Sequence, residues 1–400
     1  MSNIYIIGAG TIGRALAGVL RRHRRDVVLV RASEAVPPSL LRLRVVYEGV
    51  PIEEEVAVCG LQDVVRFDGV VVVATKSYGN AALAGVLKDK VGDSPVVIMQ
   101  NGLGVEDAFL REGIGNVYRC VLFATSQYQE DGGVVFKPVT ASPIGVVDGR
   151  ADILSSVVDA INTPVFPFAG TPDITPIAWS KTIANCVFNS VCPLLETDNG
   201  IFHRNEEALG LARKIIAECV AVAELEGIRI SAEEVTARLL LISKASDGQL
   251  ISTLQDIRSG RPTEIDTLNF AVARAAEAKG RDVPVTKALG ELVRLKSLAL
   301  MLVFVLVFLG CRGPVKDGGR VWHRGPVWVP VLIRVWRRVR IWGWVLVWQP
   351  APVLRRGCFR SKACRGIYWF FGAVFRRYTR PMVCILRGTV CCRCTTGRRR

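Results

Sequence analysis

The chain has 400 residues, enough for two domains with sizeable cores, and its formal net charge of +16 is unevenly distributed. Residues 1–310 carry 31 basic and 35 acidic side chains, a net charge of −4, whereas residues 311–400 carry 21 basic side chains and one acid, a net charge of +20. The basic character belongs to the C-terminal tail alone, so it does not indicate a nucleic-acid partner for the first three quarters of the chain.

Residues 1–170 alternate short apolar strands with helices, a pattern typical of a Rossmann domain. Continuous apolar runs such as GVVVVA indicate strands that are buried on both faces of a parallel sheet. The pattern predicts a doubly wound α/β fold with a parallel sheet. Strands are expected at residues 3–7, 27–30, 69–74 and 95–99, further strands at 118–124 and 133–136, and a helix at 11–25.

The chain opens directly on an apolar strand, without a basic segment, a long apolar run or a cleavage site of small residues. We therefore expect a cytoplasmic protein. The cysteines of residues 1–310 are scattered through apolar runs, which favours buried free thiols.

A glycine-rich motif follows the first strand and opens the first helix. It consists of Gly8, Ala9, Gly10, Thr11, Ile12 and Gly13, which spell G-x-G-x-x-G. The first glycine permits a tight turn, the second lets the backbone approach a pyrophosphate, and the third allows close packing of helix on strand. In this βαβ context the motif predicts a dinucleotide site at the helix N-terminus.

The second strand is followed by Arg31, where an acid would hydrogen-bond the ribose 2′-hydroxyl of NAD. An arginine pairs instead with the 2′-phosphate of NADPH, and Lys76 could add a second positive charge at the same place. The alternative for each residue is a solvated surface cation. Together the two residues favour NADPH over NADH.

Residues 171–298 are predicted to form a helical substrate domain, with the domain boundary near residue 170. In it, Lys181, Asn185 and Asn189 recur every four residues and share one stripe of a helix. An exposed face is the alternative, but asparagine is a poor residue for a helix interior. Burial lowers the pKa of a lysine, which can then give its proton to a ketone that accepts a hydride. Helices are expected at 174–197, 205–227, 231–245, 262–279 and 284–297, and the residues expected to pack inward beside the stripe are Ile183, Ala184, Val187 and Phe188.

A second polar segment, STLQDIRSGRPTEID, spans residues 252–266. Ser252 and Asp256 are four residues apart, and residues 263–266 are expected to open a helix after Pro262. Glu264 could orient Lys181 or hold a substrate hydroxyl. A pattern that only caps the helix start is the alternative.

Residues 299–400 form an irregular basic tail with no helical or strand period. Three interpretations compete: an out-of-frame or read-through translation, a disordered basic extension that contacts anionic surfaces, and a membrane-associated segment. The apolar run at 298–309 is shorter than the roughly 20 residues needed to span a bilayer, and the run at 327–348 carries four arginines. Cys391, Cys392 and Cys394 lack the further ligands of a zinc site, so we predict no metal.

Taken together, five segments resemble the ketopantoate reductase family, from residue 1 to about residue 296. They are GAGTIG at 8–13, ATKSY at 74–78, QNGLG at 100–104, KTIANCVFNSVCPLLETDNG at 181–200 and STLQDIRSGRPTEID at 252–266. The resemblance implies a Rossmann domain followed by a helical domain, with the active site in the cleft between them. It also implies reduction of 2-dehydropantoate with NADPH in pantothenate and coenzyme A synthesis.

The resemblance implies a role for each site residue. Lys181 would be the general acid, Glu264 would hydrogen-bond the substrate and help to position the lysine, and Arg31 with Lys76 would read the 2′-phosphate. Glu264 is also expected beside the cofactor, and Asn101 between nicotinamide and substrate. The remaining residues expected to contact substrate are Asn185, Asn189, Asn199 and Ser252.

The expected partner is a small 2-keto acid, with no nucleic acid and no membrane, and the chain is expected to be a monomer or homodimer. A reductase of another small 2-keto acid is the alternative within enzymes. A non-catalytic NADP-binding regulator is the alternative outside them, although a sensor would not need a proton donor.

Overall fold

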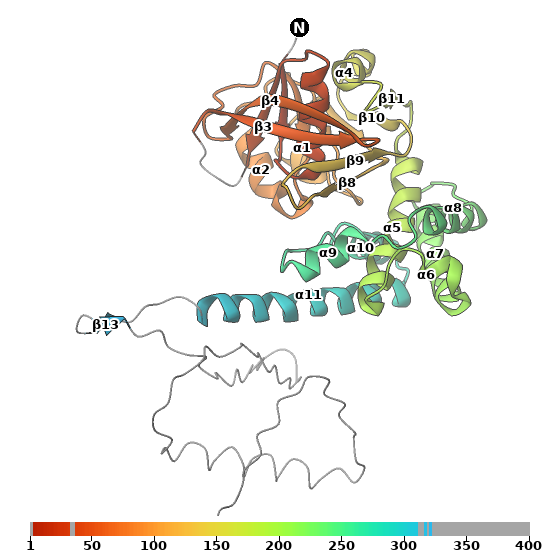
Figure 1. Ribbon diagram of the computed structural model, residues 1–400. Helices are drawn as coiled ribbons and strands as arrows, with labels where there is room; N and C mark the ends of the chain where they lie inside the picture. Colours follow the sequence, from red (N-terminus) through yellow and green to blue (C-terminus); the bar gives the residue numbers. More distant parts are fainter. Residues whose placement is uncertain (1–2, 33–36, 311–315, 318–319, 322–400) are drawn as a thin grey trace, which may run out of the picture. The chain divides into compact units, whose positions relative to one another are not determined.

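The computed structural model describes residues 3–32, 37–310, 316–317 and 320–321 (Figure 1). The chain divides into two compact units, one that ends at Arg312 and one that begins at Gly313. In the second unit the described residues form a short antiparallel pair, β12 (Lys316–Asp317) with β13 (Arg320–Val321). The remaining description concerns the first unit.

The centre of the sheet consists of parallel strands in the order β7-β6-β5-β1-β2-β4. Alternate residues of β5 point to two different apolar clusters, Val70 and Val72 to one and Val71 and Val73 to the other, and all four are buried. A strand buried on both faces explains the continuous apolar run. The strands are β1 (Asn3–Ile7), β2 (Val27–Arg31), β4 (Val50–Gly60), β5 (Gly69–Val73), β6 (Val96–Ile98) and β7 (Val117–Cys120).

Further strands extend both edges, so the sheet has eleven strands. On one side β3 (Ser39–Tyr47) is antiparallel to β4, β9 (Val134–Pro138) is parallel to β3, and β8 (Ala124–Tyr128) is antiparallel to β9. On the other side β10 (Ser142–Asp148) is antiparallel to β7, and β11 (Phe168–Gly170) is parallel to β10. The helical segments that connect the strands are α1 (Thr11–Arg22), η1 (Ser77–Gly79), α2 (Asn80–Leu87), α3 (Asp107–Arg111) and α4 (Leu154–Ile161).

After β11 the chain is helical, shown in yellow-green to blue in Figure 1. Buried apolar side chains of α5, α7, α8 and α10 form one core cluster, which includes Ile183, Val187, Ile216, Leu239 and Val272. The helices are α5 (Thr175–Leu195), α6 (Ile201–Arg204), α7 (Glu206–Leu225), α8 (Ala232–Ala245), α9 (Ser252–Arg258), α10 (Asn269–Ala278) and α11 (Pro284–Gly310).

The predicted fold class, a Rossmann sheet followed by a helical region, is confirmed. Two helix boundaries are wrong. The helix expected from residue 262 begins at Asn269, and the helix expected to end at 297 continues to Gly310. The division at residue 170 stays a prediction, because the compact unit continues past it. The interpretations of the tail beyond residue 321 lie outside the described residues.

Candidate active site

The glycine loop joins β1 to α1 by a turn that larger residues could not make. Gly8 has a φ of +121°, and a Cβ there would lie 2.8 Å from the backbone of Ala74 and Thr75. A Cβ on Gly13 would lie 1.9 Å from the Gly8 carbonyl oxygen, whereas a Cβ on Gly10 would meet nothing within 4 Å. The loop is therefore tight on the protein side and open at Gly10, which precedes the first amides of α1. The first amides of a helix lack partners within it. These features fit a bound pyrophosphate.

The loop lies at the point where the strand order reverses. β1 pairs with β2 on one side and with β5 on the other, so the carboxyl ends of β1 and β5 lie side by side. Open α/β sheets bind nucleotides at such points. Residues 8–13 and 74–78 both follow these strand ends, so the geometry fits a dinucleotide cofactor.

Arg31 and Lys76 lie at the ends of different strands, Arg31 within β2 and Lys76 after β5. Arg31 is the last residue of β2, and its carbonyl accepts a bond from Leu61 N at 3.0 Å. Its role toward a 2′-phosphate stays a prediction. The Lys76 ammonium lies 3.0 Å from Asp256 Oδ2 and 2.9 Å from Glu264 Oε2. Its role toward a 2′-phosphate also stays a prediction.

The contacts of Lys76 follow from the burial of its two partners. Both carboxylates, Asp256 and Glu264, are only 7% exposed, and buried acids require a nearby cation. Burial acts to lower the pKa of Lys76, but the charges of the two carboxylates outweigh it and raise that pKa. Lys76 therefore stays charged and links the end of β5 to the segment around α9.

Lys181 lies on α5 and points to the end of the sheet. Its ammonium donates to Asn101 Oδ1 at 2.9 Å and to the carbonyl oxygen of Leu122, and it lies 5.7 Å from the centre of the Phe123 ring. Burial, and then the charge of Arg119, lower the pKa of Lys181 to about 8. An amine with this pKa can exchange a proton near neutral pH.

The asparagines of α5 have different environments. Asn189 is buried, and its Oδ1 accepts a bond from Thr253 Oγ1 at 2.7 Å, whereas Asn185 is half-buried. Asn199 is buried, and its Oδ1 has no hydrogen-bond partner among the described residues. Ser252 is exposed as the first residue of α9. The apolar neighbours of the stripe are buried as predicted: Ile183, Ala184, Val187 and Phe188.

Glu264 lies in a turn between α9 and α10, not in the first turn of a helix. Pro262 disfavours helical backbone at Arg261, the residue before it, so α9 does not continue into this stretch. The hydrogen bond of the Glu264 carboxylate goes to Lys76, and the structure records none to Lys181 within the described residues. The charge of Glu264 acts only to raise the pKa of Lys181.

Sequence reasoning missed Arg119, although a lone arginine in the apolar run VYRCVLF indicates a buried charge. This residue of β7 is 4% exposed and donates from Nη2 to the Gly102 carbonyl at 2.9 Å. Its Nη1 lies 3.9 Å from Glu106 Oε2, and both atoms are buried without a hydrogen-bond partner among the described residues. Arg119 thus places a buried charge beside Lys181.

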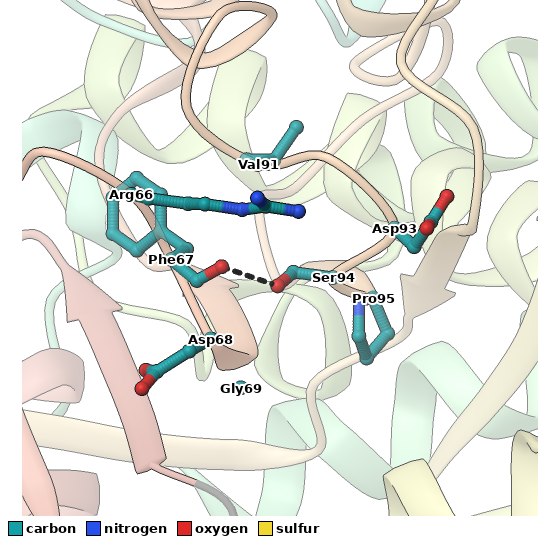
Figure 2. A pocket seen from close by; sticks show the side chains of 8 residues that line it. All are labelled: Arg66, Phe67, Asp68, Gly69, Val91, Asp93, Ser94 and Pro95. Carbon is teal, nitrogen blue, oxygen red and sulfur yellow. Dashed lines mark hydrogen bonds between the residues drawn. The ribbon is translucent and has the colours of Figure 1, made fainter.

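A hollow of about 510 Å³ lies elsewhere, before the strands β5 and β6 begin (Figure 2). Figure 2 shows the Arg66 side chain across it and the Ser94 hydroxyl, which donates to the Phe67 carbonyl at 2.9 Å. Ligands of open α/β sheets bind at the carboxyl ends of the strands. This hollow is at the opposite ends, so it is not the candidate active site.

In the part of the chain that the structure describes, no three His, Cys, Asp or Glu residues gather as a metal site. The same part contains no helix long and apolar enough to cross a membrane. Its five cysteines are free thiols, four of them buried. The site therefore consists of an amine, amides, carboxylates and a glycine loop.

Two sequence profiles of one family match the chain. The profile described as ketopantoate reductase PanE/ApbA covers residues 4–148, and the profile described as its C terminal covers residues 173–297. Each of the five segments that carry the resemblance lies within these ranges.

Relatives and solved structures agree with these matches. The 2-dehydropantoate 2-reductase of Pyrococcus horikoshii is 26% identical over 299 residues, which cover 73% of this chain and 97% of that protein. A crystal structure of a PanE/ApbA family ketopantoate reductase from Ralstonia eutropha has a TM-score of 0.65 at 24% identity, covering 74% of this chain and 99% of that one. D-mandelate dehydrogenase, solved with NADH and anilino(oxo)acetate, has a TM-score of 0.65 at 21% identity with the same coverage.

Proposed function

We propose that this chain, which belongs to the ketopantoate reductase family, reduces 2-dehydropantoate to (R)-pantoate with NADPH. The family consists of oxidoreductases that act on a keto group with a nicotinamide cofactor. The observation that carries the proposal is the pair of Lys181 and Asn101 at the carboxyl edge of the sheet, with the pKa of the lysine lowered to about 8. The expected place of the reaction is the cytoplasm, as a step in pantothenate and coenzyme A synthesis.

The protein's own groups supply binding and the proton. The glycine loop and the start of α1 would hold the pyrophosphate, and the bound nicotinamide would supply the hydride. Lys181 would give its proton to the ketone oxygen as negative charge develops there, while Asn101 orients the ammonium. The unpartnered Oδ1 of Asn199 is a candidate acceptor for a substrate hydroxyl.

NADPH is proposed over NADH on one residue. Arg31 ends β2 at the place where an acid would repel the 2′-phosphate. Lys76 adds to this preference only if cofactor binding releases it from Asp256 and Glu264.

A second candidate is the reduction of another small 2-keto acid. The likeness to D-mandelate dehydrogenase favours it, because that protein has the same fold and was solved with a different oxo acid. Lys181 and the asparagines recognise a ketone and polar groups and do not select the carbon skeleton.

Turnover of the full chain tests the proposal, with 2-dehydropantoate and a panel of 2-keto acids, each with NADPH and NADH. We expect the highest kcat/KM with 2-dehydropantoate and NADPH. Lys181→Ala should lose most turnover, because no other described group replaces the proton donor, and it should retain cofactor binding. A higher kcat/KM with another ketone would support the second candidate. Cofactor binding without turnover of any ketone would support a regulator.

A further inference from the structure

The turn after β6 is held at three successive residues by two other parts of the chain. The Asn101 carbonyl accepts from Thr267 Oγ1 at 3.1 Å, and the Leu103 amide donates to the Thr267 carbonyl at 2.8 Å. Between them, the Gly102 carbonyl accepts from Arg119 Nη2 at 2.9 Å. The polypeptide at this turn has little freedom to move.

Thr267 lies at the centre of this arrangement, three residues after Glu264. Its hydroxyl is also 3.1 Å from the Glu264 carbonyl oxygen and 3.4 Å from Ser77 Oγ. The single hydroxyl proton can be given to either carbonyl, while the oxygen accepts from Ser77. One side chain thus joins the segments that follow β5 and β6 to the turn that carries Glu264.

The contact between the two turns requires a glycine. Gly102 has a φ of +104°, and a Cβ there would lie 2.2 Å from the Thr267 carbonyl oxygen. An L side chain at this position would be strained by the backbone angle and would collide with the neighbouring backbone. The close approach of the Gly102 backbone to the Thr267 backbone therefore depends on a glycine at position 102.

We propose that Thr267 is a positioning residue, which fixes the backbone of Asn101 so that the Asn101 amide orients the Lys181 ammonium. The amide oxygen of Asn101 accepts from Lys181 while its backbone carbonyl accepts from Thr267. A shift of the turn would therefore move the partner of the lysine. The inference rests on the proposed function in its use of Lys181 as the proton donor.

Three variants of the full chain separate positioning from folding. Thr267→Val removes the hydroxyl at nearly constant volume, and Thr267→Ser restores it. Thr236→Val is the matched control, because Thr236 on α8 donates to the Ala232 carbonyl at 2.8 Å, away from these turns. We expect Thr267→Val to lower kcat by about tenfold, since small misplacements of reacting groups are costly. The cofactor Kd and the Tm should stay near those of the unchanged chain, and Thr267→Ser and Thr236→Val should retain kcat.

Amide hydrogen exchange of the peptide that covers residues 99–106 gives a readout without a substrate. We expect faster exchange in Thr267→Val than in Thr267→Ser. Unchanged exchange, or unchanged kcat in Thr267→Val, would overturn the positioning role. If the unchanged chain reduces no 2-keto acid, the proposed function fails, and the exchange rates alone decide whether Thr267 holds the turn.

Discussion

At Lys181, burial and a neighbouring cation act in the same direction. Desolvation disfavours the ammonium form, and the Arg119 guanidinium repels it, which together lower the pKa to about 8. The charge of Glu264 opposes this shift but does not cancel it. Arg119 itself is buried in β7 and held by the Gly102 carbonyl, so its charge has a fixed place.

The pH dependence of turnover should report this pKa. A proton donor must be charged, so kcat should be level below about pH 8 and fall about tenfold per pH unit above it. Arg119→Gln removes the repelling charge and can still donate to Gly102, so the falling limb should move to higher pH. Arg119→Lys keeps the charge and should leave the limb near its original position. An unmoved limb in Arg119→Gln would show that burial alone sets the pKa.

The partners of Lys76 show what a sequence can predict at the residue scale. The lysine's place after β5 followed from the local pattern, but its carboxylate partners lie 180 and 188 residues further along the chain. The same holds for Lys181 and Asn101, which are 80 residues apart. Their roles were expected from the family resemblance, whereas their contacts depend on how the helical region packs against the sheet.

At the scale of elements, the start of α11 depends on an acid from α7. Both carboxylate oxygens of Glu218 accept backbone amides, from Val285 at 3.0 Å and Thr286 at 2.8 Å, and the Thr286 hydroxyl also donates at 2.7 Å. The first amides of a helix lack partners within it, and a negative charge is favourable there. Glu218 therefore caps a helix that lies 67 residues away in sequence.

Glu218→Ala should lower the free energy of unfolding by about 0.5–2 kcal/mol, the range for loss of a helix N-cap. Urea unfolding of the chain measures the change. Glu224→Ala on the same helix is the control, because the structure records no side-chain partner for this exposed acid within its described residues. Equal losses in the two variants would show that the carboxylate does not stabilise α11.

Prediction of elements succeeded where local signals are strong. The helix expected at 205–227 forms as α7, and Asn205 caps its start, since the Asn205 Oδ1 accepts from Ala208 N at 2.8 Å. No strand is predicted over residues 39–60, where β3 and β4 form. The charged side chains there, such as Arg42 and Glu53, pair across the two strands, and this pairing cannot be recognised from the local sequence. Local pattern also placed a helix start at Glu264, which tertiary contacts hold in a turn instead.

At the scale of the whole molecule, the charge and the site lie in different parts of the sequence. The side chains of the candidate site lie between Gly8 and Thr267, within the part whose net charge is −4, and the excess of +20 lies beyond residue 310. The Pyrococcus horikoshii relative is matched over 97% of its own length by 73% of this chain. The tail therefore contributes no residue to the candidate site.

A chain of residues 1–310 should retain kcat/KM within about twofold of the full chain, because it keeps the whole of α11. A cut before residue 300 is less suitable, since it removes Leu300, which packs against Ile257, Ile265 and Val293. These residues adjoin Asp256 and Glu264 in the sequence. The two chains should differ in binding to heparin. The full chain should need more salt for elution, because its excess cations displace counterions from an anionic surface. A large loss of turnover in residues 1–310 would instead give the tail a part in the reaction, and it would move the functional boundary beyond α11.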